Sequence, residues 1–267
     1  MNNFNVSLLS PLVIEGKNIS LAWGKAVLHI LEHKGKEISP LIISVTGFKG
    51  TNIVPENFEI RKQLDSLLKE KKFRNTENVA FTIFPQRIWQ LAKGNRQTLW
   101  KFYQYSYESY KKRNPSENNR GLYFQRLVDF GCEKPCNGNQ LEWILSKYKE
   151  RRANRRSMFQ AGIFDPARDH VPNAQLQFPC MQQISFVPTQ EGLVVNAFYA
   201  TQQLLYKAYG NYLGIAQLGL FMAHEMDMEL LKINVMIGVA KLEGIGKRSF
   251  KSHKLYSAIT KNLCMME

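Results

Sequence analysis

The chain has 267 residues, of which 44% are hydrophobic and 12% aromatic, and this composition excludes an intrinsically disordered protein. The 36 Lys and Arg residues outnumber the 22 Asp and Glu residues, so the formal net charge is +14 and the chain favours anionic partners. The sequence lacks an apolar run of about 18 residues, a signal-peptide pattern and a disulfide-type cysteine framework. We therefore expect a cytoplasmic protein that does not span a membrane.

Hydrophobic spacing predicts alternating helices and strands along the chain. In chain order, the sequence predicts a helix over 20–33, a strand at 42–45, a helix over 60–68, a strand over 77–85, two helical pieces within 86–112, a polar loop at 111–120, a helix over 141–148, strands over 182–188 and 193–200, a buried helix over 213–223, a strand over 233–240 and a helix over 254–263. No linker or repeat divides these elements, so we expect one mixed α/β (α+β) domain over residues 1–267.

Aromatic side chains recur at helical spacing in the second half of the 86–112 segment. They are Trp100, Tyr103, Tyr107 and Tyr110. Such a stripe can stack nucleic-acid bases, but helical periodicity mainly indicates burial. We therefore expect the stripe in the core or at a subunit interface.

Cys180 is the candidate nucleophile, because it follows Pro179 at the point where a loop is expected to enter a strand. A catalytic thiol needs nearby cations that favour the thiolate, and the basic run at 151–156 supplies them if the fold brings it close. The same run fits a phosphate clamp or a solvated helix end. The residues alone also leave open that Cys180 is an inert buried thiol, since free cysteines are among the most buried residues.

The pattern of cysteines and histidines gives little support for a metal site. Cys132 and Cys136 form C-x-x-x-C, but no histidine pair accompanies them at a spacing typical of zinc sites. His29 and His33 lie one helical turn apart, which a solvated helix face explains without a metal. We therefore expect no bound metal.

Several short motifs between residues 121 and 223, taken together and in order, resemble those of thymidylate synthases and the related pyrimidine-nucleotide hydroxymethylases. The motifs are Gly121-Leu122-Tyr123, Asn139-Gln140-Leu141, Arg155-Arg156, Gln160–Pro166, Pro179-Cys180, Tyr199 and the apolar helix over 213–223. The family has, in the same order, G-x-Y, an Asp-Gln-Ile helix start, a paired arginine, S-A-W-N-P, Pro-Cys, the tyrosine of Y-Q-R-S-x-D and a long apolar helix.

The resemblance implies a thymidylate synthase-like fold, in which a β-sheet is layered with helices and two subunits form a sheet-to-sheet homodimer. It implies that Cys180 adds to C6 of a pyrimidine nucleotide or nucleoside, so that C5 takes a methyl or hydroxymethyl group from 5,10-methylenetetrahydrofolate. It also implies that Arg155 and Arg156 bind the phosphate of the partner subunit's substrate. The other substrate-binding residues that it implies are Tyr123, Asp165, Tyr199, Gln202 and Asn211.

The sequence departs from the family pattern at positions that bind the substrate. Thr201 stands where the family has a phosphate-binding arginine, Met181 where it has a histidine, and residues 239–243 where it has the ribose-binding D-T-H-L-Y. A threonine lacks the charge-assisted hydrogen bonds of an arginine, so we expect a reaction other than the conversion of dUMP to dTMP. The alternative is a protein that binds a nucleotide without turnover, and nucleic-acid binding is the least favoured function.

Overall fold

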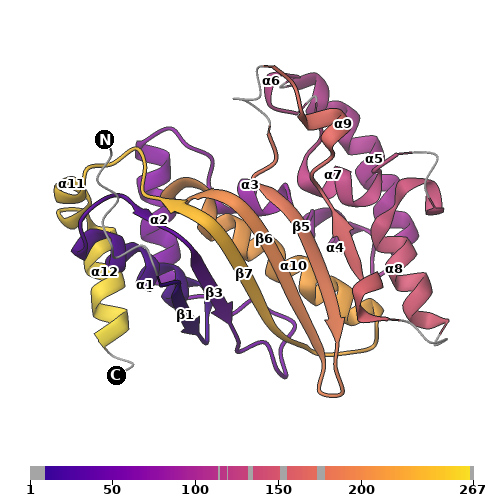
Figure 1. Ribbon diagram of the computed structural model, residues 1–267, viewed down its shortest axis with the longest axis horizontal. Coiled ribbons are helices and arrows are strands. Elements are labelled where there is room, and N and C mark those ends of the chain that lie inside the picture. The colour runs from indigo at the N-terminus through magenta and orange to yellow at the C-terminus, as the bar shows by residue number, and fades with distance from the viewer. Residues whose placement is uncertain are drawn as a thin grey trace.

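Strands from both halves of the chain build one mixed β-sheet in the computed structural model, which describes residues 10–113, 115–118, 120–131, 135–150, 155–172 and 178–264 (Figure 1). The strands are β1 (Leu12–Gly16), β2 (Glu37–Ile38), β3 (Leu41–Val45), β4 (Gln160–Gly162), β5 (Met181–Pro188), β6 (Leu193–Gln203) and β7 (Leu230–Lys241). Their order in this seven-stranded sheet is β1-β3-β7-β6-β5-β4, and β2 pairs with the end of β7. The predicted mixed α/β class is therefore confirmed.

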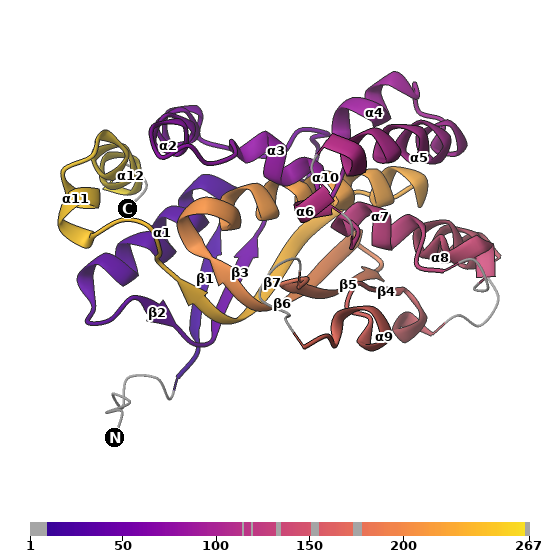
Figure 2. The same cartoon turned by 90° about the horizontal axis from the view of Figure 1, so that it is seen from above.

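Helices cover one face of this sheet (Figure 2). The helices of the described chain are α1 (Ile19–Glu32), α2 (Phe58–Glu70), α3 (Thr76–Phe81), α4 (Gln86–Leu91), α5 (Arg96–Arg113), α6 (Pro115–Asn118), α7 (Tyr123–Val128), α8 (Gln140–Lys149), α9 (Pro166–Asp169), α10 (Tyr209–Glu225), α11 (Lys247–Lys251) and α12 (Lys254–Cys264). The short α9 is the exception to this layering, because it lies beside β4 on the other side (Figure 2). Helices α1 and α10 pack directly on the strands, while α12 packs on α1 and α3 packs on α10. Within the described residues, none of these helices has the length and apolar character needed to cross a membrane.

Strands β6 and β7 run parallel at the centre of the sheet and end side by side, because Gln203 is the register partner of Lys241. Strand β5 returns antiparallel to β6, which places its first residue, Met181, opposite Tyr199 near the end of β6. Ligands of α/β proteins bind beyond the carboxyl ends of neighbouring parallel strands. This edge of the sheet therefore brings the segment around Cys180 to the place where a ligand is expected.

The predicted strand over 77–85 is wrong, because the segment forms helix α3 followed by a turn. The side chain of Asn75 caps α3 by accepting a hydrogen bond from the backbone N–H of Asn78 at 2.9 Å. The helix then packs closely on α10, where a Cβ atom added to Gly210 would lie 2.6 Å from the Cβ atom of Val79. This contact between segments distant in the sequence outweighs the local β propensity of the apolar run.

The polar segment over 111–120 is more helical than the predicted loop. Helix α5 continues to Arg113, and residues Pro115–Asn118 form α6. The amide of Asn118 donates to the carbonyl oxygen of Tyr110 at 2.9 Å, and the Tyr107 hydroxyl donates to the carbonyl oxygen of Asn118 at 2.8 Å. Proline is favoured in the first turn of a helix, so the Pro115 position fits a new helix start as well as a loop.

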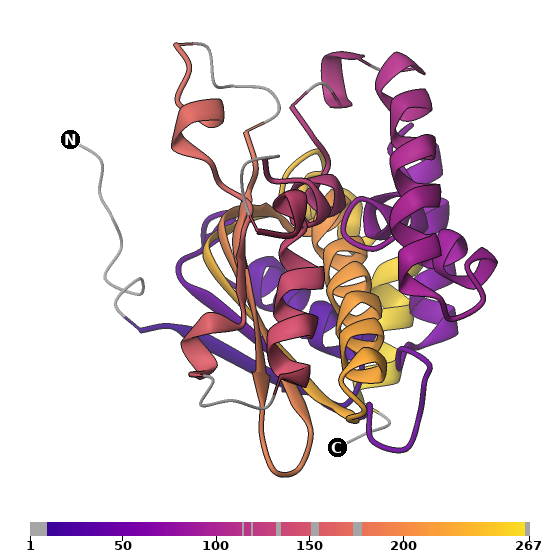
Figure 3. The same cartoon turned by 90° about the vertical axis from the view of Figure 1, so that its right-hand side faces the viewer.

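The aromatic stripe of α5 lies in the core, as predicted. Tyr103 and Tyr107 are buried, and the Tyr103 ring meets Phe124 edge-on with 4.6 Å between centroids. The ring of Trp100 lies 5.7 Å from that of Phe221 on α10, and Figure 3 shows α5 on the side of α10 that faces away from the sheet. These rings fill the space between helices, so they are not placed to stack bases.

The other face of the central strands carries no helix among the described elements (Figure 2). Three large apolar side chains are exposed there, with Val13, Met236 and Phe198 at 55%, 51% and 41%. The strand register sets Met236 beside Phe198. One pleat away, hydrogen bonds join polar side chains across four strands, in the order Ser44, Asn234, Asn196 and Ser185. We call these two sets the apolar row and the polar row.

Gly244 follows β7 and is expected to tolerate no side chain, because its φ is +74° and a Cβ atom there would overlap the Tyr206 hydroxyl. The variant Gly244→Ala should lower the free energy of unfolding by about 2–4 kcal/mol, through backbone strain and displacement of the Tyr206 ring. Gly94→Ala is the matched control, since Gly94 has a φ of +77° and open space around it. Urea denaturation measures both variants, and equal losses would contradict the contact with Tyr206.

Candidate functional site

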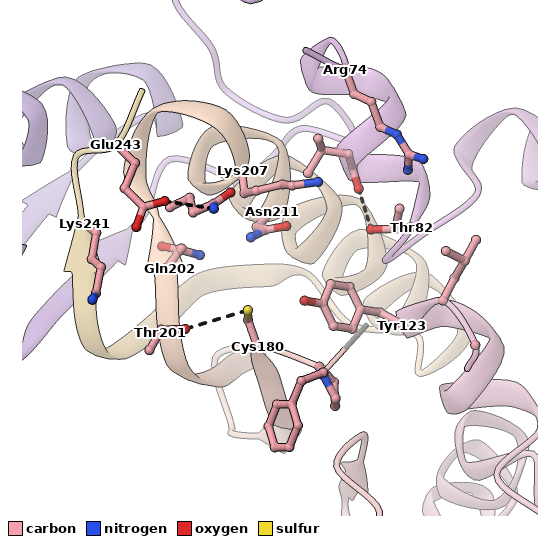
Figure 4. Close-up of a pocket in the computed structure, with 16 residues that line it drawn as sticks. Arg74, Thr82, Tyr123, Cys180, Thr201, Gln202, Lys207, Asn211, Lys241 and Glu243 are labelled. Carbon is pink, nitrogen blue, oxygen red and sulfur yellow. Dashed lines mark hydrogen bonds between the residues drawn. The ribbon is translucent and has the colours of Figure 1, made fainter. Parts of the chain in front are cut away.

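A pocket of about 680 Å³ opens at the carboxyl ends of β6 and β7 (Figure 4). Its walls come from α3 and the residues on either side of it, the start of α7, residues 178–180, the last residues of β6 and β7, and the start of α10. This volume suits a small-molecule or cofactor ligand. Because these segments are far apart in the sequence, the pocket forms only when the chain is folded.

Cys180 lies immediately before β5 and is half-buried, with its thiol on the pocket surface. Its carbonyl oxygen accepts a hydrogen bond from the Ala200 backbone N–H at 3.0 Å, which anchors the residue to β6. The Thr201 hydroxyl donates to its sulfur at 3.8 Å (Figure 4). Cys180 is therefore not a fully buried core thiol, because it lines the pocket with intermediate exposure.

Tyr123 faces Cys180 from the first turn of α7 (Figure 4). Its hydroxyl oxygen accepts a long hydrogen bond, 3.5 Å, from the Met181 backbone N–H. Burial raises the pKa of Tyr123 well above its ordinary value, and the neighbouring Cys180 raises it further. Tyr123 is thus a neutral phenol beside the sulfur. Tyr199 is fully buried behind it, with 6.5 Å between the two ring centroids, and supports Tyr123 instead of lining the pocket.

Two side-chain amides, those of Gln202 on β6 and Asn211 on α10, lie at the pocket. The Tyr212 hydroxyl donates to Oε1 of Gln202 at 2.8 Å, which fixes the orientation of that amide. The Gln202 side chain is 2% exposed, and its Nε2 has no hydrogen-bond partner within the described part of the chain. A buried donor without an acceptor costs about 1–3 kcal/mol, which is typical of a group held ready for a ligand or a bound water.

Three cations also line the pocket, and sequence reasoning did not assign them to it. Arg74 precedes α3, Lys241 ends β7, and Lys207 lies on a π-helical turn, Leu204–Ala208, between β6 and α10. Lys241 forms an ion pair with Glu37 at 2.9 Å. Burial lowers the pKa of Lys207, the Arg74 charge lowers it further, and Cys180 opposes both effects. This turn runs directly into α10, and single π-helical turns joined to α-helices are frequent at functional sites.

The remaining predicted site residues lie outside the pocket walls of this chain. Arg155 and Arg156 are exposed in the turn before β4, so their predicted role at the pocket of a partner subunit stays a prediction. Asp165 caps α9, because its carboxylate accepts a hydrogen bond from the Ala167 backbone N–H at 3.0 Å. The other two arginines of the basic run, at 151 and 152, lie outside the described residues.

The two candidate metal motifs do not form a metal site in the part of the chain that the structure covers. The rings of His29 and His33 stack with 3.9 Å between centroids, and Nδ1 of His33 pairs with the His29 carbonyl oxygen. Cys132 lies outside the described residues, while Cys136 is exposed. Among the described residues, no three His, Cys, Asp or Glu side chains gather closely enough to hold an ion.

Comparison with models of known protein families and with curated proteins finds no match to this chain. The motifs and the pocket geometry are thus the basis for a functional proposal.

Proposed function

We propose that the chain is a transferase that adds a one-carbon group at C5 of a pyrimidine nucleotide or nucleoside, with Cys180 as a covalent nucleophile. The observation that carries the proposal is that Cys180, Tyr123, Gln202 and Asn211 surround one pocket. The resemblance to thymidylate synthases names each of them as a site residue, although they belong to separate segments of the chain. Their convergence supports the resemblance independently of the motifs.

The proposed reaction begins with addition of the Cys180 thiolate to C6 of the pyrimidine. The S–C6 bond forms while the electrons of the C5–C6 double bond move toward C5 and its neighbouring carbonyl oxygen. C5 then bonds to a one-carbon electrophile. The proton on C5 passes to water, and the bond between the one-carbon unit and its carrier nitrogen breaks, so that the carrier would leave with that electron pair and take up a proton. Water, for a hydroxymethyl product, or a hydride from the reduced carrier, for a methyl product, would then add to the one-carbon unit. The S–C6 bond breaks in the same step, and the C5–C6 double bond re-forms with release of the thiolate. Soft thiolates suit such reversible additions.

The described side chains have separate roles in this scheme. Thr201 orients the Cys180 sulfur through its hydrogen bond. Tyr123 stays protonated, so its phenol can donate a hydrogen bond to the reacting ring. The amide of Asn211, which is 4% exposed and lines the pocket, pairs with donors or acceptors at the edge of the base. Such hydrogen bonds select a substrate strongly, because an analogue without the matching group leaves a buried polar atom unpaired.

The pocket also fits the proposed cofactor, 5,10-methylenetetrahydrofolate. Its volume of about 680 Å³ leaves room for a second ring system beside a pyrimidine. When bound, the cofactor supplies the one-carbon electrophile. The residues of this chain hold the pyrimidine at Cys180 and close the pocket floor with Gln202.

One observation favours the alternative, a protein that binds a nucleotide without turnover. Thr201 is the side-chain partner of the Cys180 sulfur among the described contacts, and its hydroxyl is neutral. A thiol next to a cation ionises more readily than a thiol next to a hydroxyl. Binding without covalent chemistry is therefore the second candidate function.

Mass spectrometry of the intact protein with 5-fluorinated pyrimidine nucleotides distinguishes the two functions. Fluorine cannot leave C5 as a proton does, so an adduct formed with methylenetetrahydrofolate persists. We expect one adduct on the full chain and none on Cys180→Ser, with Cys136→Ser as the control for an exposed thiol. Calorimetric binding of the same nucleotides without any adduct would favour the binding protein, and absence of both would contradict both functions.

The proposed fold includes a sheet-to-sheet homodimer, for which the uncovered sheet face is the candidate surface. Met236 lies at the centre of its apolar row and is 51% exposed. Met236→Lys should convert a dimer into a monomer, because burying an unpaired ammonium is strongly unfavourable. Sedimentation velocity measures this, with Leu91→Lys on α4 as the control, since Leu91 is 69% exposed elsewhere. A dimer that survives Met236→Lys would exclude this face.

A further inference from the structure

We propose that Lys207 and Arg74 form an oxyanion-binding subsite in the helical wall of the pocket. The subsite would bind the phosphate or carboxylate of a bound ligand. The identity of that ligand rests on the proposed function. The resemblance assigns phosphate binding to Arg155 and Arg156, so this subsite is additional to it. In Figure 4 the Lys207 side chain extends toward the side of the pocket where Arg74 lies and away from Lys241.

A ring stack joins the two segments that carry these cations. Phe73 precedes Arg74, and Tyr206 precedes Lys207; their rings stack at 3.7 Å between centroids. Tyr206 is 8% exposed and is wedged against Gly244, so the turn that carries Lys207 is held by packing. On this π-helical turn, Lys207 lines the pocket, whereas Leu205, Tyr206 and Ala208 are buried.

The charges around Lys207 favour an anion. Its ammonium makes no hydrogen bond or ion pair with any described residue, and Arg74 is near enough to lower its pKa. The acidic group of the pocket, Glu243, lies on the far side next to Lys241 and accepts a hydrogen bond from Gln203 at 2.9 Å. An oxyanion at Lys207 gains charge-assisted hydrogen bonds from the ammonium, and the Arg74 charge on the same pocket wall adds to the attraction.

Isothermal titration calorimetry on the full chain tests the subsite with two matched pairs of probes. Uridine monophosphate and uridine differ by a phosphate, while folic acid and its dimethyl ester differ by two ionised carboxylates. Lys207→Met should weaken binding of the oxyanion-bearing member of one pair by about tenfold or more, and leave the neutral member unchanged. Lys207→Arg should keep the affinity within about threefold, since it keeps the charge. Lys101→Met on the exposed face of α5 is the control.

The pair that responds identifies whether the oxyanion is a phosphate or a carboxylate. Because the pKa of Lys207 is lowered, oxyanion binding should weaken as pH rises through that pKa, and Lys207→Arg should flatten this dependence. Other titratable groups also face the pocket, but they are the same in the unaltered chain and in Lys207→Arg, so they do not account for a difference between the two. These groups are Cys180, Tyr123, Lys241 and Glu243. Phe73→Ala should weaken oxyanion binding without removing a charge.

Equal affinities for Lys207→Met and the unaltered chain would overturn the subsite, as would failure of the unaltered chain to bind either oxyanion. If no Cys180 adduct forms but Lys207→Met still weakens oxyanion binding, the proposed reaction is excluded and the subsite remains. The two proposals therefore fail independently.

Discussion

Replacing Arg126 with methionine is expected to lower the free energy of unfolding by about 3–5 kcal/mol, the largest stability effect that we predict. The guanidinium is 1% exposed and forms a bidentate ion pair with Asp169, which is fully buried, at 2.6 and 2.7 Å. It also donates to the carbonyl oxygens of Ile163 and Arg120 at 2.9 and 3.0 Å. The variant leaves a carboxylate buried without its partner, which is why the expected loss exceeds that of an ordinary hydrogen bond.

Urea denaturation measures this loss, with Glu150→Gln as the matched control. Glu150 pairs with Lys147 at the surface, at 2.9 Å and with a side chain 49% exposed, so its removal should cost less than about 1 kcal/mol. The double variant Arg126→Met/Asp169→Leu should be more stable than Arg126→Met alone, because it removes the stranded charge. A single variant as stable as Glu150→Gln would contradict the burial of this pair.

The same ion pair predicts how stability depends on pH. Burial tends to raise the pKa of Asp169, but hydrogen bonds from Arg126 and from the Asp165 backbone outweigh it and hold that pKa below the ordinary value of 3.8. The stabilisation is therefore complete above that ordinary value and is lost as pH falls through the lower pKa of the folded state. Asp169→Asn should show a smaller loss of stability over this acid range.

Cys180→Ser is expected to lower turnover by about a thousandfold or more, since removing an enzyme nucleophile has effects of this size or larger. A serine hydroxyl is a much poorer nucleophile at neutral pH than a thiolate. Its similar size should leave the pocket intact, so uridine monophosphate should bind with nearly unchanged affinity. Single-turnover assays and calorimetry measure the two quantities on the same protein.

Cys264→Ser is the control for general effects of removing a thiol, because Cys264 is exposed at the end of α12. A Cys180→Ser protein that keeps full turnover would exclude covalent catalysis by Cys180. A variant that loses binding together with turnover would show instead that the thiol is part of the binding surface.

The sequence predicts most of this fold because burial leaves a local pattern. Helix α10 is apolar around nearly its whole circumference and is the helix that packs between the sheet and the outer helices. Strands β5 and β6 alternate buried and accessible residues, as their sequences indicate. The strand prediction for 77–85 is wrong because the apolar residues of this segment fit either a strand or a helix. The close packing against Gly210 and Gly214 on α10 favours the helix, and these glycines lie far along the chain.

The candidate site is predictable only in part. Cys180, Tyr123, Gln202 and Asn211 belong to segments that resemble a family, so their convergence was expected. Arg74 and Lys207 have no such motif; they line the same pocket, and the stack of Phe73 on Tyr206 joins the segments that carry them. A local signal was nevertheless present, since Lys207 is a single charge within the buried stretch Leu204–Ala208.

The polar row on the uncovered sheet face lowers the free-energy cost of removing water from that face. Its Asn234 amide donates to Asn196 at 2.8 Å, and Asn234 in turn accepts from Ser44 at 2.9 Å. Polar groups that satisfy one another within a sheet give up little when water leaves, whereas isolated amides would lose hydrogen bonds to solvent. The face can therefore alternate between wet and dry surroundings without rearranging its side chains, and its polarity alone does not exclude close contact with another surface.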